Sequence, residues 1–263
     1  MEFAVLNSSK SLSDTDAEYM VIACQAQAVE FCAAYGLDAP AAALYRDVSK
    51  LPVDDVWICE ITDTMDEPGA LGYHADFGNR PYIRVLAQGP QTSITLSHEF
   101  LELLGDRTCD RWAKRGDGTE VAVEVADPVE GDCYPQLAEL AGEGRTVDVS
   151  NYVLGSWFDP NGTAPFDRLG KLTAPFQMDA GGYVVVLDRG GNETEVFARV
   201  EHGGQAGIRA AGLKLAKANG RLLRRLRASS AHPLVPGGQP KNERGAASGE
   251  PPATQPARQG STR

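Results

Sequence analysis

The sequence predicts an α+β fold, and three observations lead to this fold class. Apolar residues recur at helical spacing from about residue 16 to residue 35. A second helix, apolar around most of its girth, is predicted over residues 94–105. Short segments rich in β-branched residues precede and follow this second helix. The chain has 263 residues and 42% hydrophobic content, which suffices for a real core.

The first helix is predicted to begin at a capping box and to end at a glycine. Thr15 is the expected N-cap, Glu18 stands three residues later, and Gly36 supplies the C-cap. Its stripe of apolar residues carries no chemistry, so we expect a core helix. Ahead of the second helix we expect three short strands, at residues 43–48, 55–62 and 82–86.

The second helix carries the residues that indicate a function. On a helical wheel, Glu99, Glu102 and Asp106 all fall within about 100° of His98. Residues 94–106 contain no Lys or Arg, whereas an ordinary surface helix has a wide polar face of mixed charge. Three carboxylates on a mostly buried helix repel one another unless a positive group lies among them. A divalent metal ion meets this need and also suits a neutral imidazole.

The run His98-Glu99-x-x-Glu102 resembles the HExxH helix of zinc metallopeptidases, the zincins. The resemblance implies a zincin-like domain in which Glu99 is the general base that activates a zinc-bound water. Gly105 falls where metzincins carry the glycine that turns the chain after this helix. Two departures are present: Glu102 replaces the second histidine, and Thr108 stands where metzincins have a third.

A longer pattern joins Ser-His-Glu-x-Leu-Glu at residues 97–102 to Glu-x-x-Asp-Pro-Val-Glu at residues 124–130. This pattern is similar to a group of poorly characterised phage and bacterial proteins that are presumed to be metallopeptidase-like. The similarity spans about residues 68–183 and leaves the substrate open. Zincins also bind peptide substrates along an antiparallel edge strand beside the active-site helix, a role that the resemblance gives here to Tyr82–Leu86.

We expect His98 and Glu102 to bind the metal, which is Zn2+ or another divalent cation, while Glu99 serves as the general base. Asp106 is the preferred third ligand. Gly105 is expected to end the helix in the left-handed conformation, after which the short Asp106 side chain reaches back to the ion. Two further acidic residues remain alternatives for the third ligand: Asp110 and Glu124.

Two neighbouring segments have alternative interpretations. The strand predicted at Thr119–Ala126 turns its valines to one side and Glu120 and Glu124 to the other, and it ends at Asp127. This second face either brings another carboxylate to the metal or faces solvent. His74 is interpreted first as a solvent-facing loop residue, and alternatively as a fourth ligand or a transition-state donor. A hairpin is also expected at residues 182–187 and 194–200.

Charge divides the chain into an acidic body and a basic end. The net charge is -11, yet residues 204–263 carry eleven basic and two acidic side chains. We expect a zincin-like domain over residues 1–203, a basic amphipathic helix over 204–228 and a disordered tail over 229–263. The acidic body should repel nucleic acid. The basic helix is a candidate for binding an anionic surface, nucleic acid or an acidic partner.

The sequence predicts a cytoplasmic location, either in a host cell or in a virion if the chain is phage-encoded. Its five cysteines are widely spaced and form no CxxC pair, which is typical of reduced, buried thiols. The chain has no apolar run of 18 residues and no basic start followed by a long apolar stretch.

These features together predict a metal-dependent hydrolase, most simply a zinc metallopeptidase. A first rival is a phage or mobile-element structural or assembly protein that keeps a zincin-like fold without activity. The replacement of the second histidine by Glu102 and the long tail favour this rival. A second rival is a module that binds anionic surfaces through residues 207–228. An enzyme should hold close to one metal per chain and lose activity with a chelator, whereas a structural relic should hold none, or hold metal without turnover.

Overall fold

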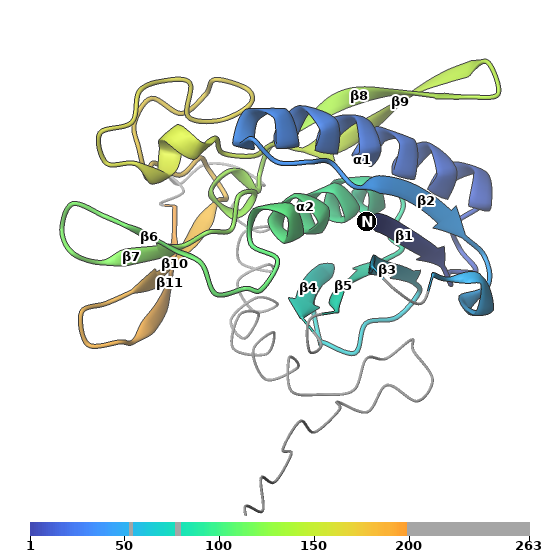
Figure 1. Cartoon of the computed structure of the whole chain (residues 1–263), viewed down its shortest axis with the longest axis horizontal. Helices are drawn as coiled ribbons and strands as arrows, with labels where there is room; N and C mark the ends of the chain where they lie inside the picture. The colour runs from blue at the N-terminus through green and yellow to red at the C-terminus, as the bar shows by residue number, and fades with distance from the viewer. Residues whose placement is uncertain (53–54, 77–79, 199–263) are drawn as a thin grey trace, which may run out of the picture.

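The computed structural model describes residues 1–52, 55–76 and 80–198 (Figure 1). These residues combine two α-helices with several sheets, which confirms the α+β class in its general form. The basic helix expected at 204–228 and the tail expected at 229–263 lie outside the described residues. Within the described part, no helix has both the length and the apolar content that a membrane span requires.

A five-stranded mixed sheet lies beneath the helices, with the strand order β2-β1-β3-β5-β4. The pairs β1–β2, β1–β3 and β3–β5 are parallel, whereas β4 runs antiparallel to β5. The five strands are β1 (Glu2–Asn7), β2 (Ala41–Tyr45), β3 (Val56–Thr62), β4 (Gly72–Asp76) and β5 (Pro81–Leu86).

The strand expected at the edge of the sheet lies inside it. Tyr82–Leu86 belongs to β5, which pairs with β3 on one side and with β4 on the other. Among the described residues β4 is the last strand on this side. Asp76 at the end of β4 pairs with Pro81 at the start of β5, so the two strands are antiparallel neighbours. The edge position assigned to Tyr82–Leu86 is therefore wrong, and β4 occupies it.

Two helices, α1 (Asp14–Tyr35) and α2 (Gln91–Gly105), cover one face of this sheet (Figure 1). The main core cluster draws its side chains from both helices and from β1, β3 and β5. The rings of Phe3 on β1 and Phe100 on α2 stack with centroids 3.7 Å apart. This apolar contact holds the functional helix against the middle of the sheet.

The ends of α1 follow capping rules, with one shift from the prediction. Ser13, rather than Thr15, is the N-cap, because its side chain accepts a hydrogen bond from the backbone N–H of Asp16. The Ser13 hydroxyl also donates to the Asp16 carboxylate at 2.6 Å, and the cap lies two residues earlier than expected. Gly36 ends the helix with φ of 67°, as predicted.

A smaller antiparallel sheet of four strands and a separate hairpin complete the described chain, and short 3₁₀ turns lie at residues 48–50, 127–129 and 155–158. The β10–β11 pair confirms the predicted hairpin. The strands of the small sheet are β6 (Trp112–Lys114), β7 (Glu120–Ala122), β10 (Tyr183–Leu187) and β11 (Glu193–Phe197); the separate hairpin is β8 (Cys133–Leu140) with β9 (Glu143–Ser150).

The strand predicted at Thr119–Ala126 is shorter than expected, because β7 stops at Ala122. The chain then passes close to the end of α2. A Cβ atom placed on Gly105 would lie 2.8 Å from Cγ1 of Val125. Gly105 ends α2, as predicted, but it has no positive φ. Its lack of a side chain therefore serves this close approach and not a left-handed cap.

Candidate metal centre

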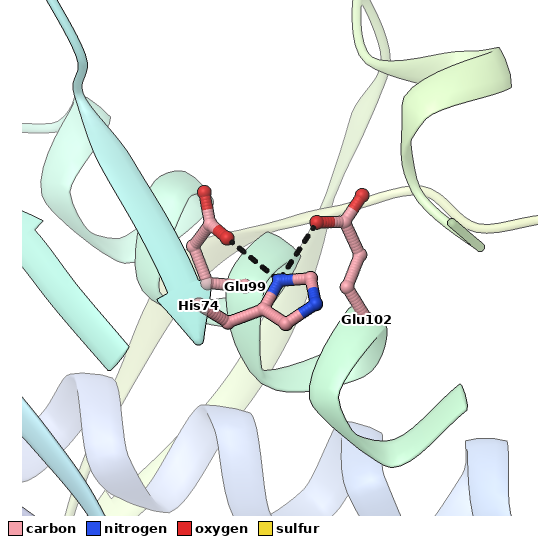
Figure 2. Close-up of side chains that lie close together, drawn as sticks. All are labelled: His74, Glu99 and Glu102. Carbon is pink, nitrogen blue, oxygen red and sulfur yellow. Dashed lines mark hydrogen bonds and ion pairs between the residues drawn. The ribbon is translucent and has the colours of Figure 1, made fainter. Parts of the chain in front are cut away.

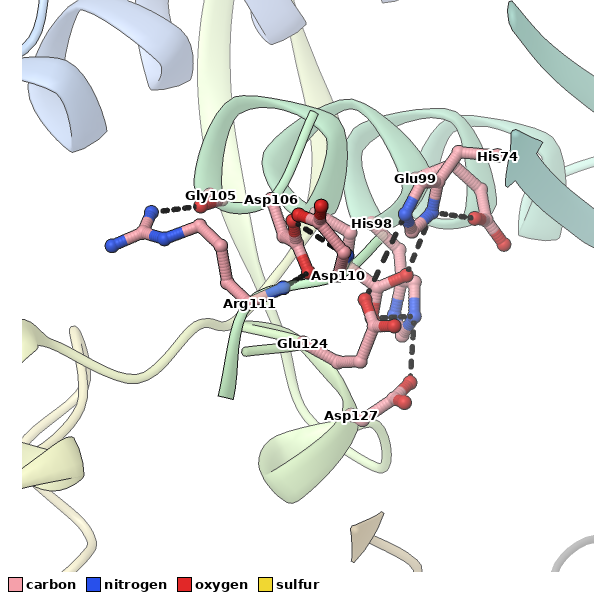
Figure 3. A network of polar contacts seen from close by, with 10 residues as sticks. His74, His98, Glu99, Gly105, Asp106, Asp110, Arg111, Glu124 and Asp127 are labelled. Carbon is pink, nitrogen blue, oxygen red and sulfur yellow. Dashed lines mark hydrogen bonds and ion pairs between the residues drawn. The ribbon is translucent and has the colours of Figure 1, made fainter. Parts of the chain in front are cut away.

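The α2 helix places three of the predicted site residues on one buried face. His98 is 5% exposed, Glu99 is 2% exposed, and Glu102 is fully buried. His98 and Glu102 stand one helical turn apart, so their side chains lie one above the other. Figure 3 shows side chains from α2, from β4 and from the chain after β7 meeting at this face.

His98 lies between two carboxylates. Its Nε2 atom is 3.1 Å from Oε1 of Glu102 and 3.2 Å from Oδ1 of Asp127. Asp127 opens the 3₁₀ turn that follows the close pass over Gly105, and it is 1% exposed. One ligand atom from each of these three residues lies within 4.8 Å of the others, so the group can hold a metal ion.

A second group forms around His74, which lies on β4 and is fully buried. Its Nδ1 atom is 3.2 Å from Oε2 of Glu99 and 3.4 Å from Oε2 of Glu102 (Figure 2). These three side chains also place ligand atoms within 4.8 Å of one another. The first interpretation of His74, as a solvent-facing loop residue, is therefore wrong.

Strand alternation explains why His74 points at the helix. Its neighbours Tyr73 and Ala75 belong to a separate cluster with Tyr82, whereas its register partner Ile83 belongs to the main core below the helices. The strand also lies very close to α2, because a Cβ atom on Gly72 would be 2.5 Å from Cγ2 of Thr95. A glycine at this position allows β4 to bring His74 to the helix.

Glu124 approaches His74 from the side opposite to Glu99. Its Oε2 atom lies 3.7 Å from Nε2 of His74, and the side chain is only 3% exposed. Of the two interpretations of the second face of the Thr119–Ala126 segment, the structure supports the buried one, since Glu124 and Asp127 both turn to the site (Figure 3). The valines at 121, 123 and 125 are buried elsewhere in the core, as predicted.

The structure places Asp106 apart from these groups. Its carboxylate accepts hydrogen bonds from the backbone N–H groups of Asp110, at 3.2 Å, and Arg111, at 2.9 Å (Figure 3). Asp106 shares a face with His98 but follows it by two turns, about 12 Å along the helix axis. Neither Asp106 nor Asp110 belongs to a metal-capable group of the described residues, and the group around His98 contains Asp127 instead.

Electrostatics keep the central carboxylate ionised. Burial alone would raise the pKa of Glu102, but His98 and His74 outweigh burial and hold its pKa well below the usual range. The nearest polar partners of the two Glu102 oxygens are the two imidazole nitrogens, at 3.1 Å and 3.4 Å. The carboxylate therefore lies between two imidazoles at ion-pair distance.

No family model, curated protein or solved structure matches the chain.

Proposed function

We propose that this protein is a metal-dependent hydrolase, most simply a zinc peptidase with a zincin-like fold. The observation that supports the proposal most strongly is the buried group of His98, Glu102 and Asp127. One nitrogen and two carboxylate oxygens form a ligand set that zinc accepts, and three protein ligands are typical of catalytic rather than structural zinc sites. In this proposal Asp127 replaces Asp106 as the third ligand.

Glu99 is the proposed general base. A cation bound by the three ligands would polarise a carbonyl group and lower the pKa of water toward ~7. Glu99 follows the first ligand on the same helix, and His74 holds its Oε2 atom at 3.2 Å. The carboxylate is therefore oriented within the site, where it can accept the proton that the attacking water loses.

The arrangement around β4 supports a peptide substrate. β4 is antiparallel to its neighbour, lies last in the sheet among the described residues and packs beside α2. An extended peptide can add to such an edge by backbone hydrogen bonds. In the resemblance to zincins this is the strand that binds substrate, and β4 takes the role that the sequence assigned to Tyr82–Leu86.

The deciding experiment measures metal content and turnover together on the full chain. Elemental analysis of purified protein should find bound divalent metal. The same protein should cleave a fluorescently labelled unfolded casein, lose this activity to a chelator and regain it with Zn2+. Glu139→Gln, on the exposed surface of β8, is the matched control and should retain both properties. Bound metal without turnover would favour the structural or assembly protein, and the absence of metal would contradict the proposal.

A further inference from the structure

Glu102 belongs to both metal-capable groups of the described residues. Its Oε1 atom faces Nε2 of His98 at 3.1 Å, whereas its Oε2 atom faces Nδ1 of His74 at 3.4 Å. Each oxygen therefore serves a different imidazole. Each imidazole also has a second carboxylate of its own, Asp127 for His98 and Glu99 for His74.

The burial of Glu102 gives an independent reason to expect ligands at both oxygens. The side chain is fully buried, and neither oxygen has a well-formed hydrogen bond beyond its contact with one imidazole. A buried carboxylate whose partners are only two imidazoles keeps acceptor positions that a cation can fill. A single cation at Oε1 would compensate one oxygen and leave the other facing only an imidazole.

The formal charge of the buried side chains around Glu102 also favours two cations. The six buried side chains include four carboxylates, and imidazoles that ligate a metal are neutral, so in a metal-bound site these side chains carry a formal charge of -4. One divalent cation reduces this charge to -2, and two cations neutralise it. The buried residues concerned are His74, His98, Glu99, Glu102, Glu124 and Asp127.

We infer that the site binds two divalent cations, with Glu102 as the carboxylate bridge between them. His98 and Asp127 complete the first position, and His74 and Glu99 complete the second. Two-metal sites with bridging ligands hold their ions about 3.5–4 Å apart, a spacing that the two oxygens of one carboxylate can span. The nitrogen and oxygen ligands suit Zn2+, Mn2+, Fe2+ or Co2+.

The inference goes beyond the proposed function, which requires only the cation at the first position. Glu99 serves the second cation through Oε2, the oxygen that faces His74. Its other oxygen, Oε1, lies toward Gly72. The second position can therefore be tested without reference to turnover.

The test is a titration of the metal-free full chain with Zn2+, followed by calorimetry and elemental analysis. We expect two ions per chain in the parent and in Glu139→Gln, and one ion per chain in His74→Ala. Glu102→Gln should weaken both positions. If circular dichroism shows that His74→Ala is unfolded, His74→Gln, which retains bulk, takes its place. One ion per chain in the parent, unchanged in the folded His74 variant, would overturn the inference.

Mn2+ loading tests the bridge itself. Two ions joined by the Glu102 carboxylate should be spin-coupled, and their electron paramagnetic resonance spectrum should differ from that of the single ion in His74→Ala. Two uncoupled ions would overturn the bridge. A single ion with chelator-sensitive turnover would overturn the inference and leave the proposed function standing. Turnover that is absent despite two coupled ions would contradict the proposed function alone.

Discussion

The side chains of His74 and Glu99 lie 3.2 Å apart, although 25 residues separate them in the sequence. His74 lies on β4, the outermost described strand on its side of the sheet, and Glu99 lies on α2. This contact joins β4 to α2 within the site, so the position of the Glu99 carboxylate depends on the packing of a strand outside the HExxE motif.

Replacement of Glu99 by glutamine tests its role as the base. Glu99→Gln keeps the size of the side chain but removes its capacity to take a proton, so hydrolysis should fall by roughly 100-fold or more. The cation held by His98, Glu102 and Asp127 should remain bound. Initial rates on the labelled casein and elemental analysis measure the two effects. Unchanged turnover would remove Glu99 from the mechanism.

The identity of the third ligand can be tested with a pair of aspartates. Asp127→Ala should weaken metal binding about as much as His98→Ala, because both side chains belong to one group. Asp106→Ala should leave the affinity nearly unchanged. It should instead lower the free energy of unfolding by about 1–3 kcal/mol, since two backbone N–H groups lose their acceptor.

Competition with a chromophoric chelator gives the affinities of these variants, and urea unfolding gives their stabilities. Asp110→Ala serves as a control, because Asp110 is exposed and lies outside both metal-capable groups. If Asp106→Ala lost the metal while Asp127→Ala kept it, the third ligand would be the one that the sequence first suggested.

Local periodicity accounts for the part of the site that could be predicted from the sequence. One continuous segment contains His98, Glu99 and Glu102 at helical spacing. The same segment contains the apolar residues that cover the rest of the helix surface. Sequence reasoning therefore finds α2, its burial and its carboxylates. The alternation of valines in the 119–126 segment likewise predicts that they share one face, and all three are buried.

The remaining site residues depend on contacts between distant segments. His74 is 25 residues from Glu99, and Asp127 is 29 residues from His98. His74 is interpreted first as a loop residue, whereas Gly72 allows β4 to approach Thr95 closely and to bring His74 to the helix. Likewise, Gly105 suggested a left-handed cap, whereas the passage of Val125 requires the glycine there. A glycine alone does not distinguish a turn from a close approach.

Buried thiols give a prediction about pH. Burial raises the pKa of Cys24 to about 12, whereas an unfolded thiol titrates near 9. The folded state therefore holds its proton where the unfolded state loses it, so this residue lowers stability as pH rises from about 9 toward 12. Urea unfolding at pH 8 and pH 10 should show the decrease, and Cys24→Ala should show a smaller one.

Alkylation provides a second readout of the same burial. Cys133 is exposed, whereas the other four cysteines are buried. Iodoacetamide at pH 8 should therefore modify Cys133 first, and mass spectrometry of proteolytic fragments can locate the label. Labelling of Cys24 in the native protein at a rate similar to that of Cys133 would contradict the packing of α1 against the sheet.

The close approach of β4 to α2 is tested by adding one methyl group at Gly72. Gly72→Ala places a Cβ atom 2.5 Å from Cγ2 of Thr95 and 3.0 Å from Oε1 of Glu99. Such overpacking should cost about 1–3 kcal/mol of stability and should move His74 away from the helix. Metal affinity should fall with it, because His74 and Glu99 belong to one group.

The double variant Gly72→Ala/Thr95→Ser separates steric crowding from other effects of the alanine. Serine lacks the Cγ2 atom, so the strand can return toward α2, and much of the lost stability and metal affinity should recover. Thr95→Ser alone should change stability by no more than about 1 kcal/mol. Urea unfolding of the four proteins gives the coupling energy between the two positions. Two results would contradict the close packing of β4 against α2: a Gly72→Ala variant as stable as the parent, or no recovery of stability in the double variant. Either result would also contradict the position of His74 beside Glu99.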